Sequence, residues 1–153
     1  MTPAQAIADA RNLAKILRSA SLAAPLKKCK EIVRGSIKGN FDSATAPDGG
    51  AWPKRKPSKY DDGHPLLDET GFLKAAALGL GPGGFDEIEQ RSMSIGIDTS
   101  VDQGGIPFAD VHDHGIGKMP ERHFFAATEL ALDECGEVIG DGMHEKLLAG
   151  GEG

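Results

Sequence analysis

Helical periodicity is confined to the two ends of this 153-residue chain. Near the N-terminus, apolar residues recur at three- and four-residue steps over residues 7–37, across Pro25. Near the C-terminus they recur in the same way over residues 132–147, although three glycines weaken the pattern. The sequence therefore predicts an N-terminal helical segment and a C-terminal helix, with a long stretch of a different kind between them.

The middle of the chain carries turn signals in place of helical periodicity. The chain contains 21 Gly and 9 Pro, and many of them fall in two stretches without an apolar repeat. A chain of this length fits one domain, and we expect an α+β fold in which a small antiparallel sheet packs with an N-terminal and a C-terminal helix. The expected segments of this single domain (1–153) are a helical segment at 1–39, formed by one kinked helix or two consecutive helices over 3–38, a long loop at 40–66, a β-hairpin region at 67–98, a loop at 99–127 with one helical turn near 107–113, and a helix at 128–148.

Alternation of side chains places the β-region. Met93, Ile95 and Ile97 alternate with small or polar residues, which is typical of a half-buried strand. We expect its partner strand over residues 73–80, with the turn of the hairpin at 81–84 (GPGG). The Ala-rich run within 73–80 is also compatible with a helix, but the hairpin context favours a strand.

Charge is distributed unevenly along the chain, whose formal net charge is −6. Residues 1–60 hold 12 Lys or Arg and 4 Asp or Glu, whereas residues 61–153 hold 5 and 19. This asymmetry predicts head-to-tail association of copies, or a docking face opposite a solvated one. The alternative is that the N-terminal helices have solvated basic faces. Arg11, Lys15 and Arg18 share such a face on the first predicted helix.

The cysteines and the distribution of apolar residues argue against a disulfide-bonded secreted protein and against a membrane-spanning protein. Cys29 and Cys135 both fall on apolar faces of predicted helices, and we expect buried free thiols there. The N-terminus lacks the continuous apolar region of a secretory signal. No stretch approaches the ~20 apolar residues that span a bilayer, so we expect no membrane partner.

Histidines gather in the stretch PFADVHDHGIGKMPERHFF, residues 107–125, which holds three of the five in the chain. Zinc takes three or four imidazole, thiolate or carboxylate ligands, and the stretch offers Asp110, His112, Asp113, His114 and His123. The spacing matches no established ligand motif, and neutral histidines bonded to loop backbone are commoner. We expect no bound metal or other cofactor. A small metal-dependent hydrolase that uses His112, His114 and His123 is the alternative function.

Other functional motifs are incomplete. GLGPGG at 79–84 matches G-x-G-x-x-G, but no parallel strand precedes it and no helix follows, so a hairpin turn is favoured. The chain has no G-x-S-x-G motif and no carboxylates paired for acid–base catalysis, and we expect no enzyme. The basic stretch WPKRKPSKY at 52–60 could contact phosphate, so a nucleic-acid-binding module that uses residues 1–60 is a third possibility.

Several motifs follow one another in a particular order. GGAWP (49–53) comes first and LLDETGFL (66–73) second, followed by PFADVHDHG (107–115) and MPERHFF (119–125) before the last predicted helix. This order resembles the phage virion morphogenesis or tail completion family, small structural proteins of the head–tail junction, or neck, of tailed bacteriophages. Phe108 and Asp113 differ from the Tyr and Gln that are usual in that family.

The resemblance implies structural and interfacial roles for the motif residues. Gly71 would give a permissive backbone to a turn into the first strand, and Gly115 would shape the loop after a short helical turn. Phe124 or Phe125 would anchor the last helix in the core, while Trp52 packs on its own domain or, as the alternative, on a partner. The residues marked in this way are Trp52, Thr70, Gly71, Phe108, His112, Gly115, Pro120, Arg122 and Phe125, with Pro120 and Arg122 fixing the start of the last helix.

The resemblance also implies a function. The chain would be a structural virion protein that forms a ring at the head–tail junction, as a neck, tail completion or tail terminator protein, joining head and tail and letting DNA pass. Its partners would be its own copies, as a hexamer or alternatively a dodecamer, and neighbouring connector or adaptor and tail proteins, with DNA passing without sequence recognition. It would be located in the virion, and in the host cytoplasm during assembly. The acidic half would line or approach the lumen.

Overall fold

The chain has an α+β fold, as its sequence predicts. The computed structural model describes residues 2–56, 63, 65–68, 70–98 and 108–150, so part of the expected loop at 99–127 and part of the basic stretch at 52–60 lie outside the described residues. In chain order the elements are α1 (Pro3–Ser19), α2 (Ala23–Ser43), α3 (Phe72–Ala77), β1 (Gly84–Ile88), β2 (Met93–Ile97), α4 (Phe108–Asp113) and α5 (Glu129–Gly150).

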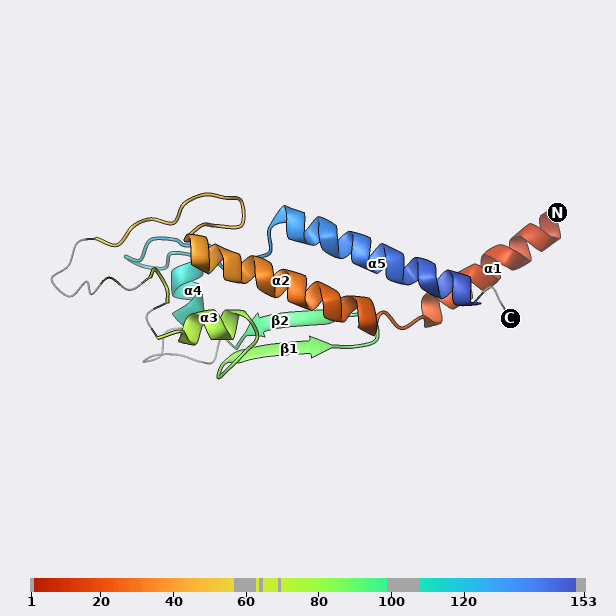
Figure 1. Ribbon diagram of the computed structural model, residues 1–153, viewed down its shortest axis with the longest axis horizontal. Helices are drawn as coiled ribbons and strands as arrows, with labels where there is room; N and C mark the ends of the chain where they lie inside the picture. Colours follow the sequence, from red (N-terminus) through yellow and green to blue (C-terminus); the bar gives the residue numbers. More distant parts are fainter. Residues whose placement is uncertain (1, 57–62, 64, 69, 99–107, 151–153) are drawn as a thin grey trace.

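α2 is the central helix of the molecule (Figure 1). α5 runs along one side of α2, and the β1–β2 hairpin lies on the other side in contact with it. α3 covers part of the same hairpin. α1 points away from this body and contacts α5 near the C-terminal end of that helix, where Ile16 meets Gly150. The three layers therefore form the body, and α1 projects from it.

The N-terminal segment forms two consecutive helices, one of the two arrangements expected. Thr2 caps α1 and exchanges hydrogen bonds with Gln5 in a reciprocal capping box. α1 ends where Ala20 adopts extended backbone. Pro25 lies in the first turn of α2, where a backbone N–H would have no helical partner, so the proline does not disturb the helix.

α2 continues to Ser43, beyond the end at 39 that the sequence suggested. Its last turn is stabilised by burial, because Asn40 and Phe41 face the core. Ala44 then adopts left-handed backbone, with φ of 52°, and ends the helix. The loop expected at 40–66 consequently begins after residue 43.

The strand expected over residues 73–80 is wrong, because this segment contains helix α3. Ala has the highest helix propensity, and three consecutive alanines favour a helix over a strand. Gly71 precedes α3 with φ of 73°, so the permissive backbone expected at this position starts a helix and not a strand.

The hairpin is formed instead by β1 and β2, which pair antiparallel with Gly84 opposite Ile97 and Ile88 opposite Met93. The strand predicted around Met93 is thus confirmed. The turn of the hairpin lies at 89–92, not at GPGG as expected. GPGG joins α3 to β1, and its bend uses the positive φ of Gly81 and Gly83.

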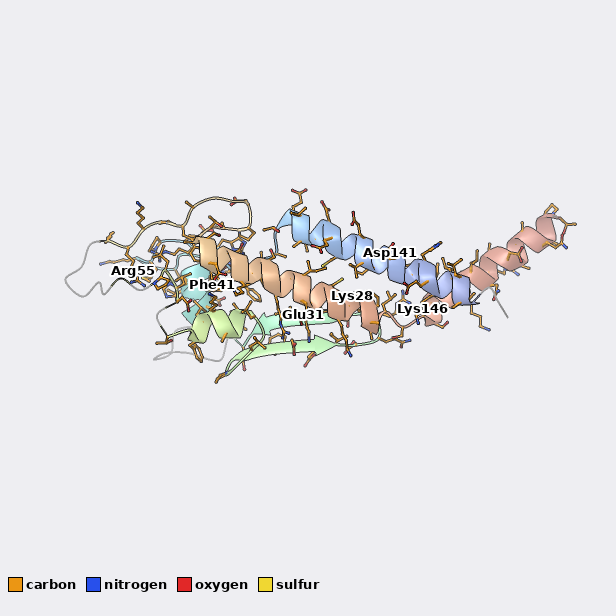
Figure 2. All side chains as sticks on the ribbon, viewed as in Figure 1. Lys28, Glu31, Phe41, Arg55, Asp141 and Lys146 are labelled. Atoms are coloured by element: carbon orange, nitrogen blue, oxygen red, sulfur yellow. The ribbon has the colours of Figure 1, made fainter. Side chains whose placement is uncertain are left out.

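A buried hydrophobic cluster lies at the C-terminal end of α2. Phe41 is its centre, with ring centroids 5.7 Å from Trp52 in an edge-on arrangement and 5.2 Å from Phe124. Figure 2 shows Phe41 beside α4 at this end of the molecule. The cluster comprises Ile37, Phe41, Trp52, Leu73, Ala77 and Phe124. It joins α2, α3 and both long loops into one core.

The contact between α2 and α5 confirms the buried free thiols. Cys29 and Cys135 face each other, and each thiol lies 3.6–3.7 Å from the other residue's carbonyl oxygen. Burial, reinforced by the nearby Cys29 thiol, raises the pKa of Cys135 to about 11. Farther along, Gly142 packs against Pro25, where an added Cβ would lie only 2.8 Å from the ring. Small residues thus allow the two helices to approach closely.

Ion pairs tie α2 to the hairpin. Lys30 and Arg34 both contact Asp86 of β1, at 2.6 Å and 2.5 Å, and Arg34 also donates to the carbonyl oxygen of Leu78 at 2.8 Å. The hydrogen bond from Lys30, together with both cationic charges, holds the pKa of Asp86 below its usual range. Part of the basic N-terminal half is therefore used inside the molecule, while the basic residues of α1 remain exposed.

Candidate functional site

The histidine-containing segment packs around the core at the C-terminal end of α2. α4 supplies the predicted residues His112 and Asp113, and the chain then returns through Arg122 and His123 to the buried Phe124. Gly115 makes this return possible, because it has φ of 65° and an added Cβ would lie 2.6 Å from the backbone nitrogen of Glu121. The segment is therefore a tight loop closed on α4.

Asp113 is the centre of a hydrogen-bond network. Its buried carboxylate accepts hydrogen bonds from the backbone N–H groups of Phe124 at 2.8 Å and Phe125 at 3.0 Å. The other carboxylate oxygen lies 3.0 Å from Nδ1 of His123. Asp113 thus fixes the path of the chain toward α5.

Arg122 connects this loop to the loop that contains Trp52. The side chain of Arg122 is only 5% exposed, and its Nε donates to the carbonyl oxygen of Pro53 at 3.0 Å. In return, Trp52 donates from Nε1 to the carbonyl oxygen of His123 at 3.1 Å. Burial, and then the charge of Arg55, lower the pKa of Arg122. Trp52 therefore packs on its own domain, the first of the two possibilities for this residue.

His112 is half-buried and is joined to Arg122 through the backbone. Its carbonyl oxygen accepts a hydrogen bond from the backbone N–H of Arg122 at 2.9 Å. Desolvation, and then the charge of Arg122, hold the pKa of His112 below the ordinary value of 6.5. The imidazole is therefore neutral at physiological pH.

Asn40 is a core residue that the sequence reasoning missed. It is buried, and its Nδ2 donates to the carbonyl oxygens of Phe124 at 3.0 Å and Ala126 at 2.9 Å. Nearby, Ser36 accepts a hydrogen bond from the backbone N–H of Thr128, the residue before α5. Asn40 lies three positions after Ile37 on the apolar stripe of α2, which is the sequence signal for a buried polar residue once the helix is known to extend to Ser43.

The start of α5 therefore depends on more than Pro120 and Arg122, the residues expected to fix it. Thr128 accepts a hydrogen bond from the backbone N–H of Ala131 at 3.3 Å, as a helix cap does. Pro120 is half-buried in the loop before Arg122. α5 begins one residue after the position predicted from periodicity.

The remaining predicted residues lie apart from this network. Thr70 and Gly71 precede α3, with the hydroxyl of Thr70 accepting from the backbone N–H of Phe72 at 3.4 Å. Phe108 begins α4, but its side chain lies outside the described part of the chain. Phe125 packs on the core cluster, with its ring 6.4 Å from that of Phe124. Arg11, Lys15 and Arg18 are exposed on α1, which projects from the opposite end of the molecule (Figure 1).

Two of the three histidines approach the same carboxylate oxygen of Asp113, with Nδ1 of His123 at 3.0 Å and Nδ1 of the 67% exposed His114 at 3.8 Å. The third, His112, is half-buried and is affected by the charge of Arg122. Among the described residues, no three His, Cys, Asp or Glu side chains are arranged to hold a metal ion. Their arrangement fits a structural network that joins α2, α4 and two loops.

Comparison of the chain with models of protein families, with curated proteins and with solved structures finds no match. Functional conclusions therefore rest on the residues themselves. Within the described ranges, no helix combines the length and apolar character needed to cross a membrane.

Proposed function

We propose that this chain is a structural virion protein of a tailed bacteriophage that forms a ring at the head–tail junction, joins head and tail and lets DNA pass. One observation carries the proposal beyond the motif resemblance: the polar motif side chains are used to hold loops together. Asp113, Arg122 and Trp52 all bond backbone groups of the same chain. Side chains used in this way stabilise the conformation of the loops, and a protein that acts by assembly depends on the conformation of its surface.

The exposed charge is consistent with association of copies. The exposed face of α5 is strongly acidic, whereas α1 carries a basic row. Opposite charges on separate elements favour head-to-tail contacts, which close into rings when the rotation between copies permits. In such a ring, acidic surface near the lumen would repel the DNA phosphates and keep the passing strand from binding. The acidic residues of α5 are Glu129, Asp133, Glu134, Glu137, Asp141 and Glu145.

The proposal includes no catalytic step and no cofactor. The alternative, a metal-dependent hydrolase that uses His112, His114 and His123, has less support because no three His, Cys, Asp or Glu side chains of the described residues are arranged to hold a metal ion. Metal analysis of the purified protein separates the two functions. Stoichiometric zinc that is lost in a His123→Ala variant would favour the hydrolase.

The decisive experiment is to inactivate the gene in a tailed phage that carries it. We expect lysates that contain separate filled heads and tails when viewed by electron microscopy, and joined infectious particles when wild-type protein is supplied in trans. The wild-type protein should also be present in purified virions. Infectious particles that form normally without the protein would overturn the proposal.

A further inference from the structure

α1 is an amphipathic arm that contacts α5 at its C-terminal end, where Ile16 meets Gly150, and is exposed along the rest of its length. None of its described residues is buried, and residues 2–13 are all exposed. Ile7 and Leu13, on its apolar side, are 53% and 47% exposed. The stability of a helix in a protein comes mainly from packing its apolar face, and most of this face of α1 is left unpacked within the chain. The arm therefore has the properties of an element that is covered by a partner.

The direction of the arm is fixed at its C-terminal end. The guanidinium of Arg91, in the hairpin turn, donates to the carbonyl oxygens of Leu17 at 2.6 Å and Arg18 at 3.1 Å. The side chain of the neighbouring Gln90 donates to the carbonyl oxygen of Ser19 at 3.1 Å. These bonds satisfy carbonyl groups that a helix leaves unpaired at its end. They hold α1 pointing away from the body (Figure 1).

An open groove of about 860 Å³ lies on the body, between α2, the start of α5 and the loop after α2. Gly35 and Gly39 line it from α2, and a Cβ added at either would meet no atom of the described structure within 4 Å. Leu130, which is 78% exposed, lines it from α5. Glu134 adds negative charge to the lining, and Glu31, which is paired with Arg34 at 2.9 Å but 66% exposed, adds a second carboxylate. The groove thus combines an exposed apolar side chain, free space and acidic groups.

We propose that α1 of one copy docks into the α2–α5 groove of a neighbouring copy. This inference rests on the proposed ring function and names the surfaces that would build the ring. The apolar side of the arm would cover Leu130, and Arg11 and Lys15 would approach Glu31 and Glu134. The occupant is a second copy because the bonds of Arg91 and Gln90 direct each arm away from the groove of its own chain.

The contact is heterologous, since two different surfaces meet. Each copy offers one arm and one groove, so copies add head to tail until a ring closes. A single helix in a groove buries less surface than a standard stable interface, so an isolated contact is weak. The contact that closes the ring forms within one assembly, so no further copy loses its translational freedom. This favours the complete ring over open chains.

The test uses one variant for each surface and a matched control, all in the full chain. Gly39→Leu fills the groove, and the open space at this position lets the fold accept the new side chain. Leu13→Asp places a charge on the apolar side of the arm without touching the core. Gly140→Leu is the control, because it adds the same side chain at another open glycine on a helix, outside the groove. Circular dichroism checks that all variants keep the wild-type helix content.

We expect wild type and Gly140→Leu to form oligomers whose mass by sedimentation and native mass spectrometry rises with concentration. Gly39→Leu and Leu13→Asp should each be monomeric, with the apparent Kd of association raised roughly tenfold or more. A mixture of these two variants should form one-to-one dimers, because Leu13→Asp retains a groove and Gly39→Leu retains an arm. No symmetric self-contact predicts this rescue.

Two outcomes would overturn the inference. One is a wild-type protein that stays monomeric up to millimolar concentration, and the other is an oligomer that neither variant weakens. Neither outcome decides the proposed function, which depends on the virion experiment and would survive if the ring used other surfaces. Conversely, arm-dependent oligomers of a protein that virions do not need would support the contact and remove the virion function.

Discussion

At the scale of single residues, Asp113 joins the segment before α5 to α4. Its carboxylate accepts two backbone N–H groups and faces His123. A buried N–H group that loses its acceptor has given up its hydrogen bonds to water without a replacement. Asp113→Ala should therefore lower the free energy of unfolding by about 1–3 kcal/mol. Urea unfolding measures this change, and the neighbouring, exposed His114→Ala should stay within about 0.5 kcal/mol of wild type. Equal effects of the two variants would contradict the structural role of Asp113.

His112 gives a second prediction at this scale, concerning pH. Burial and the charge of Arg122 hold its pKa below 6.5 in the folded state. The unfolded chain therefore binds more protons just below pH 6.5, and the free energy of unfolding should decrease as pH falls from 6.5 through the folded pKa. In His112→Gln this contribution is absent, so urea midpoints measured between roughly pH 7 and pH 5 should fall less than in wild type. Identical pH profiles would refute the assignment.

At the scale of elements, α5 contains glycines with opposite environments. Gly142 lies against Pro25, so a Cβ there overlaps a rigid ring, whereas a Cβ at Gly140 meets nothing in the described structure within 4 Å. Gly142→Ala should destabilise the fold by about 1–3 kcal/mol through overpacking. Gly140→Ala should stabilise it by about 0.5–1 kcal/mol, because Ala has the higher helix propensity. Thermal unfolding measures both, and a melting temperature that rises in both variants would show that α5 does not pack on Pro25 in solution.

At the scale of the whole molecule, charge separation is the property that governs association. Lys30 and Arg34 are paired with Asp86 between α2 and β1, whereas the basic row of α1 is exposed on an element separate from the acidic face of α5. Interactions between exposed charges are screened by salt, so association of copies should weaken as ionic strength rises. The same property predicts a specific effect of reversing the charges on the arm.

Replacement of Arg11, Lys15 and Arg18 by Glu should impair assembly, because the arm would then repel the acidic surface of a neighbouring copy. The matched control reverses three other exposed lysines, Lys27, Lys28 and Lys146, which gives the same net charge. Sedimentation of the purified proteins and complementation of the gene-deficient phage measure the two effects. Equal loss of association in both triple variants would assign the effect to net charge alone.

Sequence alone determined the features that depend on local pattern. Apolar spacing predicted helices at both ends of the chain, alternation predicted the strand around Met93, and the positions of Cys29 and Cys135 predicted buried free thiols. These features follow from which side of one element is apolar, and that information is contained in a few consecutive residues. The sequence motifs also indicated which residues near position 112 matter, but they did not indicate the hydrogen-bond partners of these residues.

Tertiary structure decided the rest. The segment at 73–80 has competing local preferences, since its alanines favour a helix and the expected hairpin favours a strand, and the packing of Leu73 and Ala77 into the core from one helical face supports the helix. The bonds between Arg122 and Pro53, and between Trp52 and His123, join residues about seventy positions apart, a pairing that no local pattern encodes. From sequence alone, the side chains of Asp113 and His123 could serve either as metal ligands or as hydrogen-bonding groups that hold the loop. Only the path of the chain, which brings buried backbone groups within reach of Asp113, decides between these uses, because a buried polar group must find its partner in space and not in sequence.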